Sequence, residues 1–186
     1  MQAVNKQLDV ASIFPEVLEI SDASLREKVI AVWQRLWQES KFDDVAQVPV
    51  SPKLSYPHIP HNRSVVQMAL RVAEVLERFH GTRVNRDHLL AAAILQDASK
   101  LVEYEPGQGG VVSSELGGAY QHAFYAAHVA LEVGLPHEVV QAILMHTAEA
   151  PQFPPTLIAK ILFYVDQIDM AALGGDRWKK TGMVYR

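Results

Sequence analysis

Cysteine is the first absence that restricts what this chain can do, because none occurs among its 186 residues. Disulfide bonds, zinc sites built from thiolates and a cysteine nucleophile are therefore excluded. A bound metal ion would have to be held by imidazole nitrogen or by carboxylate or amide oxygen.

Long apolar runs and blocks of basic residues are also missing. No stretch approaches the roughly 18 apolar residues that a membrane span needs, and residues 1–14 lack the pattern of a secretory signal. We therefore expect a cytoplasmic protein without a membrane partner. The formal net charge of -4 and the lack of a lysine or arginine cluster argue against a nucleic-acid partner, whose binding surface would be basic.

Apolar residues make up 49% of the chain, enough for one domain with a sizeable core, and their spacing is helical almost throughout. The first helix is predicted from about Ser21 to Glu39, with Ser24 and Glu27 spaced as in a capping box. Four prolines between residues 45 and 60 predict an extended connector. The next helix is expected to start at His61.

A central helix is predicted after Gly81, which is placed to end the helix before it. Asn85 suits the N-cap of this central helix, and its apolar run Leu89–Leu95 leads directly into Gln96 and Asp97. Glycines between residues 103 and 118 then predict a loop or a small hairpin. Further helices are expected over residues 119–132, 136–147 and 157–172, with a turn at residues 151–155.

These patterns predict the all-α fold class, as a single helical bundle. We assign residues 61–186 to this domain and residues 1–60 to an N-terminal helical extension and proline-rich connector packed on it.

Metal-ligand residue types recur at roughly helical spacings in or beside the apolar runs. His122 shares a helix face with two apolar residues, whereas His128 lies about 240° further around the axis. A polar side chain on an apolar stripe needs a partner, because burying it unpaired costs on the order of several kcal/mol. Each of these residues alone could be an ordinary hydrogen-bonded core residue, but one shared metal would satisfy all of them. The candidate ligands are His61, Gln96, Asp97, His122, His146 and Asp166.

The segment Leu89–Lys100 resembles the core motif of the HD-domain metal-dependent phosphohydrolases, in which an apolar helix ends in His-Asp followed three residues later by Lys. Here Gln96 stands in place of that His. His61–Val65 resembles the first His of the family, Gly134–Thr147 the second half of members with two extra histidines, and Phe163–Asp166 the final Asp helix. The resemblance covers roughly residues 60–170.

This resemblance implies an HD-like fold, a divalent metal cofactor and hydrolysis of a nucleotide or another small phosphate ester. It places His61, Gln96, Asp97 and Asp166 around a first metal ion. In members with two metal ions, the resemblance implies that Asp97 bridges to a second ion held by His122 and His146. The expected cofactor is one or two ions of Mn, Fe, Ni, Zn or Mg.

Gln96 keeps two other functions open, because an amide oxygen is a weaker ligand than imidazole for transition metals. A degraded site would suit a ligand-binding or regulatory protein, and some HD-like proteins are binuclear-iron oxygenases. The metal content of the purified protein would separate these classes. His58 could supply the missing imidazole, with an exposed loop residue as the alternative.

A phosphohydrolase reading assigns catalytic roles to two residues of the motif. Asp97 would hold the metal, and Lys100, one turn further on, would bind phosphate or neutralise developing charge. Arg63 is a second candidate for a phosphate contact. The alternatives are a solvated helix end for Lys100 and a surface charge for Arg63. The expected partner is a phosphorylated small molecule, and the sequence leaves the oligomeric state open, a homo-oligomer included.

Overall fold

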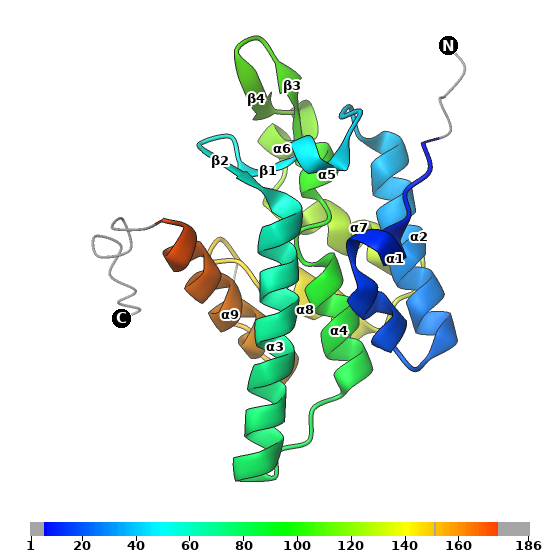
Figure 1. Cartoon of the computed structure of the whole chain (residues 1–186), viewed down its shortest axis with the longest axis vertical. Coiled ribbons are helices and arrows are strands. Elements are labelled where there is room, and N and C mark those ends of the chain that lie inside the picture. Colours follow the sequence, from blue (N-terminus) through cyan, green and yellow to red (C-terminus); the bar gives the residue numbers. More distant parts are fainter. Residues whose placement is uncertain (1–5, 151, 175–186) are drawn as a thin grey trace.

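The computed structural model describes residues 6–150 and 152–174, and the all-α expectation is confirmed, because helices dominate and the strands form only two short hairpins (Figure 1). Pro151 in the predicted turn and the end of the predicted domain at residues 175–186 lie outside the described residues. Along the chain the elements are α1 (Val10–Ile13), η1 (Pro15–Glu19), α2 (Ala23–Glu39), η2 (Val45–Gln47), β1 (Pro49–Ser51), β2 (Leu54–Pro57), α3 (His58–His80), α4 (Arg86–Leu95), α5 (Lys100–Glu103), β3 (Tyr104–Gly107), β4 (Gly110–Ser113), α6 (Glu115–Ala119), α7 (Phe124–Glu132), α8 (His137–Met145) and α9 (Leu157–Leu173).

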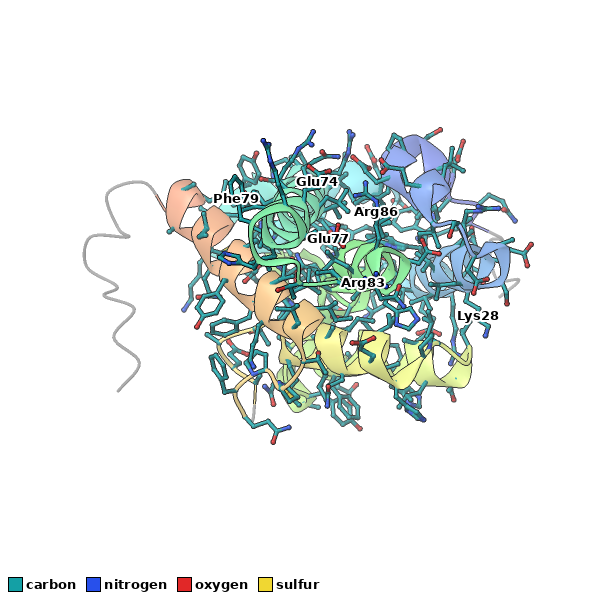
Figure 2. All side chains as sticks on the ribbon, turned by 90° about the horizontal axis from the view of Figure 1, so that it is seen from below. Lys28, Glu74, Glu77, Phe79, Arg83 and Arg86 are labelled. Atoms are coloured by element: carbon teal, nitrogen blue, oxygen red, sulfur yellow. The ribbon has the colours of Figure 1, made fainter. Side chains whose placement is uncertain are left out.

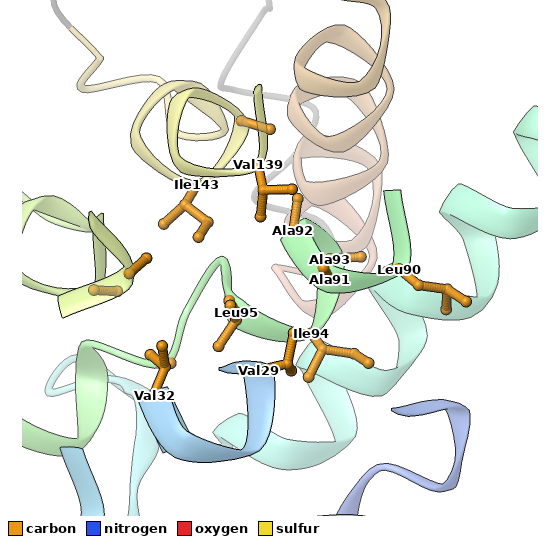
Figure 3. Close-up of a cluster of buried hydrophobic side chains, with 14 of the residues drawn as sticks. Val29, Val32, Leu90, Ala91, Ala92, Ala93, Ile94, Leu95, Val139 and Ile143 are labelled. Atoms are coloured by element: carbon orange, nitrogen blue, oxygen red, sulfur yellow. The ribbon is translucent and has the colours of Figure 1, made fainter. Parts of the chain in front are cut away.

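Helix α4 lies at the centre of the bundle, as its apolar run predicted. Asn85 caps it by accepting a hydrogen bond from the His88 backbone N–H at 3.1 Å. Every residue from Leu89 to Leu95 is buried, which requires neighbours on all sides of the helix. Figure 3 shows Val29 of α2 on one side of α4 and Val139 of α8 on the other. The end of α4, where Asp97 follows, is therefore inside the protein.

Helix α3 packs against α4 and α9 and begins at His58, three residues before the predicted start at His61. The prediction was wrong because Pro60 was read as part of the connector. In the first turn of a helix, proline removes an N–H group that has no partner there anyway. His61 is therefore in the first turn of α3. Gly81 ends the helix with a φ of 64°, as expected for a left-handed cap.

Helix α2 has its N-cap at Asp22 and not at the predicted capping box of Ser24 and Glu27. The Asp22 side chain accepts a hydrogen bond from the Leu25 backbone N–H at 3.1 Å. An aspartate one turn before the first buried apolar residue suits this position as well as serine does. Trp33 of α2 donates its indole N–H to the Ile94 carbonyl at 3.1 Å, so the N-terminal helices share one core with the rest.

Two antiparallel hairpins lie at the same end of the molecule, around the start of α3 (Figure 1). The first, β1–β2, replaces the extended connector predicted over residues 45–60. The chain is extended over most of residues 49–57, as predicted, but the two strands also pair, because prolines at the margins of a short two-stranded edge do not prevent pairing. The second, β3–β4, confirms the loop or hairpin predicted between residues 103 and 118.

The opposite end of the bundle carries ordinary surface charge. Figure 2 views this end and labels Glu74, Glu77 and Phe79 of α3 beside Arg86 at the start of α4. Arg86 forms ion pairs with Glu19 at 3.0 Å and with Glu74 at 3.7 Å. Among the described residues, no helix is long and apolar enough to cross a membrane.

Candidate metal centre

Asp97 is the point at which the ligand types predicted from the sequence converge. Its side chain is only 1% exposed, and it follows α4 in a tight turn. The His122 Nε2 atom lies 2.9 Å and the His146 Nε2 atom 3.5 Å from Asp97 Oδ1. On the other oxygen, His61 Nε2 lies 3.0 Å and Lys100 Nζ 2.6 Å from Oδ2. Residues from two helices, α3 and α5, and from two non-helical segments, at His122 and His146, thus face a single carboxylate.

Three of these residues are grouped tightly enough to hold a metal ion. One ligand atom from each of Asp97, His122 and His146 lies within 4.8 Å of the other two. Two imidazoles and a carboxylate form a donor set that suits Zn, Mn, Fe or Ni.

His61 and Asp166, two further predicted ligands, lie on the other side of Asp97, and Gln96 is buried next to it in the sequence. His61 Nε2 is 3.3 Å from Asp166 Oδ1 and 3.0 Å from Asp97 Oδ2. The geometry of neither contact is that of a hydrogen bond, so this nitrogen has no hydrogen-bond partner among the described residues. The Gln96 amide is fully buried, and neither of its polar atoms has a hydrogen-bond partner in the described part of the chain. The unpartnered Nε2 atom of His61 thus lies close to the carboxylates of Asp97 and Asp166, and imidazole and carboxylate are donor types that bind divalent cations.

The other nitrogen of each histidine is fixed by a partner outside this group. His61 Nδ1 donates to Asp169 Oδ2 and His122 Nδ1 donates to Glu103 Oε2, both at 2.7 Å. His146 Nδ1 donates to a backbone carbonyl at 2.7 Å. A proton on Nδ1 leaves Nε2 with the lone pair that a metal needs, and such partners are usual behind metal-binding histidines.

Sequence reasoning did not find Asp169 and Glu103. Asp169 follows Asp166 by three residues, and Glu103 follows Lys100 by three. Both pairs have the spacing of neighbours on one helix face, and this signal could have indicated them.

His122 does not belong to a helix, contrary to the prediction of a helix over residues 119–132. Helix α7 begins at Phe124, and Ala123 before it has a φ of 69°, which costs on the order of 1–2 kcal/mol for a residue other than glycine. Glu103 holds this turn, because its Oε1 accepts the Ala123 backbone N–H at 3.1 Å while its Oε2 accepts from His122. Periodicity alone cannot reveal a turn that depends on a carboxylate twenty residues away.

The centre has a strongly negative electrostatic character. Burial lowers the pKa of His61, but the carboxylates of Asp166, Asp169 and Asp97 outweigh this effect and raise it to about 11. Burial likewise lowers the pKa of His122, while Glu103 and Asp97 raise it to about 10. Carboxylates that favour positive charge on imidazole to this extent also favour a bound cation in its place.

Asp97 itself remains ionised in these surroundings. Burial raises its pKa, but the Lys100 ammonium and the imidazoles of His122, His146 and His61 hold the pKa well below its usual value. The centre therefore offers a carboxylate, and not a carboxylic acid, to a cation.

His58 is buried, so the expectation of an exposed loop residue was wrong. Its ring stacks on Trp33 with the centroids 5.7 Å apart, and neither ring nitrogen has a partner among the described residues. Burial lowers the pKa of His58 to about 3, so the ring is neutral at physiological pH.

A cavity of about 810 Å³ opens from the metal centre towards the two hairpins, within the size range of small-molecule sites. Asp97, Lys100 and His122 line it at one end. Arg63 does not line it and forms an ion pair with Glu16 at 3.0 Å, as the surface-charge alternative expects. The rest of the wall includes Ser51, Lys53, Tyr104, Val112, Tyr120, Thr147, Glu149 and Gln167.

The chain is similar to the dihydroneopterin 2',3'-cyclic phosphate phosphodiesterase of Methanocaldococcus jannaschii. The two sequences are 29% identical over an alignment of 167 residues, and the match covers 81% of this chain. This chain spans 65% of the length of that relative. No family model matches the sequence, and no solved structure matches the chain.

Proposed function

We propose that this protein is a metal-dependent phosphohydrolase of the HD superfamily that cleaves a small phosphate ester. The observation that carries the proposal is the convergence of three imidazole Nε2 atoms and Lys100 on the buried carboxylate of Asp97, at the end of a cavity of substrate size. The similarity to a phosphodiesterase acting on a phosphorylated pterin supports the same reaction class.

Asp97, His122 and His146 would hold one divalent ion, and His61, Asp166 and Gln96 would complete a second site that also uses Asp97. The imidazole-rich set favours Mn, Fe, Ni or Zn, whereas the amide of Gln96 makes the other site weaker and more tolerant of Mg. A bound divalent ion would supply Lewis acidity and lower the pKa of a water molecule, so that no protein nucleophile is required.

The residues of the chain then orient and stabilise the substrate. Lys100 is buried beside Asp97, and its ammonium would neutralise negative charge on the phosphoryl oxygens as the ester bond breaks. Glu103 and Asp169 bind Nδ1 of His122 and His61, and they would thereby keep the Nε2 atoms directed at Asp97 and at a bound metal ion. The hairpin residues would limit the access of bulk water to the phosphate end of the cavity.

A phosphodiester is the first substrate class to test. The similar protein is named for a 2',3'-cyclic phosphate, so we propose dihydroneopterin 2',3'-cyclic phosphate and nucleoside 2',3'-cyclic phosphates as initial substrates. In this proposal the partner of the chain is a phosphorylated small molecule.

The deciding experiment measures metal content and hydrolysis together. The purified protein is loaded in turn with Mn, Fe, Ni, Zn and Mg, and each form is assayed with cyclic and linear phosphate esters, with Asp97→Ala as the inactive control. Metal-dependent hydrolysis that is lost in Asp97→Ala supports the proposal. A metal-loaded protein that cleaves no ester refutes it, and two tightly bound irons together with oxygen consumption would indicate an oxygenase instead.

A further inference from the structure

Tyr120 presents an open aromatic ring to the cavity that contains Asp97. The residue is 54% exposed and lines that cavity. One face of its ring is covered by Phe124, with the centroids 5.0 Å apart and the planes at 12°. Phe124 is itself stacked on His128, at 6.5 Å and 4°. The ring of Tyr120 is thus supported from behind, while its remaining surface is available to a ligand.

The position of Tyr120 is linked to that of the metal ligand His122. The Tyr120 backbone N–H donates to the Leu116 carbonyl at 3.1 Å and ends α6. Helix α6 approaches α5 so closely that a Cβ atom at Gly117 would collide with the backbone carbonyl of Glu103. The carboxylate of the same Glu103 binds His122. One residue therefore sets both the aromatic ring and the metal ligand.

The cavity is larger than a phosphate group requires and continues past the aromatic ring. Tyr104 and Tyr120 also line a second cavity of about 460 Å³, and Asp97 is not among the residues that line it. A ligand with its phosphate at Lys100 would have its organic part beside these two tyrosines. Planar heterocycles stack favourably on such rings, and this stacking does not require a particular base, because every heterocyclic base has a π-face.

We propose that Tyr120 is the stacking platform for a planar heterocycle carried by the substrate, and that the substrate class is the phosphate esters of heterocycles of purine or pterin size. This inference rests on the proposed function for the placement of the phosphate. Tyr120 acts in substrate binding and has no part in the bond-breaking step.

The test compares two substrates that share a five-membered cyclic phosphate, namely guanosine 2',3'-cyclic phosphate and glycerol 1,2-cyclic phosphate. Tyr120→Leu removes the ring, Tyr120→Phe keeps it, and Phe79→Leu removes a ring that is 68% exposed at the far end of α3 (Figure 2). If the guanine base stacks on the Tyr120 ring, the KM for the guanosine ester should be about tenfold higher in Tyr120→Leu than in the wild type, with little change in kcat. Tyr120→Phe and Phe79→Leu should keep the wild-type KM, and the glycerol ester should not distinguish the variants.

Each alternative result overturns a different statement. Equal effects of Tyr120→Leu on both substrates, or no effect on either, refute the stacking platform while the proposed function stands. Should no ester be cleaved with any metal, the proposed function fails, and calorimetric binding of guanosine 2',3'-cyclic phosphate to the wild type and Tyr120→Leu still decides on the platform. Tyr120→Trp provides a check on misfolding, because a larger ring should preserve or lower the KM.

Discussion

Glu103→Gln should weaken metal binding at the Asp97, His122 and His146 site while preserving the fold. Glutamine has the size of glutamate, and its amide oxygen can still accept the Ala123 backbone N–H that Oε1 accepts in the wild type. The amide NH₂ group would then face His122 Nδ1, where the wild type has a carboxylate oxygen at 2.7 Å. With the NH₂ group donating to Nδ1, the proton of a neutral His122 would be on Nε2. Nε2, the atom directed at Asp97, would then lack the lone pair that binds a metal.

The expected magnitude follows from this change of proton position. Loss of the partner behind a metal-binding histidine costs about 10- to 100-fold in metal affinity, which corresponds to about 1.4 to 2.7 kcal/mol. Asp169→Asn is the matched variant on the other side, because Asp169 holds His61 in the same way. We expect Glu103→Gln to affect the site containing His122 and Asp169→Asn to affect the site containing His61.

Isothermal titration of metal-free protein with Mn or Zn measures both affinities, and urea unfolding in EDTA measures the stability of the apo fold. A Glu103→Gln variant with wild-type metal affinity would show that His122 is not a ligand or that Glu103 does not set its proton. An affinity loss matched by an equal loss of apo stability would assign Glu103 a purely structural role.

Four further outcomes are expected. Asp97→Ala should abolish both metal binding and metal-dependent hydrolysis. Lys100→Ala should retain the metal and should raise the KM or lower kcat for a phosphate ester. Metal binding that is retained in Asp97→Ala and lost in Lys100→Ala, as measured by calorimetry, would contradict the assignment. Gln96→His should raise metal occupancy, measured by elemental analysis, because imidazole is the better ligand; unchanged occupancy would place residue 96 outside the site. The pKa of His58 is lowered to about 3 in the folded protein, so its burial contributes stability at pH 7 that is lost as the pH falls from about 6.5 towards 3. In EDTA, lowering the pH from 7 to 5 should therefore reduce the free energy of unfolding less in His58→Phe than in the wild type. An equal reduction in the two proteins would disprove this.

The apolar run Leu89–Leu95 made both the position of α4 in the sequence and its burial predictable. A helix that is apolar on every side must be surrounded, and this condition also buries the residues that follow it. Asn85 and Gly81 marked neighbouring helix boundaries correctly because their cap conformations depend only on local backbone geometry. The start of α3 and the hairpin β1–β2 were missed, since proline tolerates both a first helical turn and the margin of a short strand.

Residue type and order predicted the candidate ligands from the sequence, and the resemblance to the HD family predicted that they act together. In the structure, Asp97, His122 and His146 are grouped closely enough to hold a metal ion. For His61 and His122, only the tertiary structure decided which nitrogen faces Asp97, because that depends on Asp169 and Glu103, which lie far away in the sequence. For His146 the partner is local, the Ile143 carbonyl three residues earlier. The tertiary structure also decided the conformation at His122, which lies in a turn held by Glu103 and not in the predicted helix. Helical periodicity is a local property of the chain, whereas the lone-pair directions of His61 and His122 are fixed by partners that are distant in sequence and adjacent only after folding.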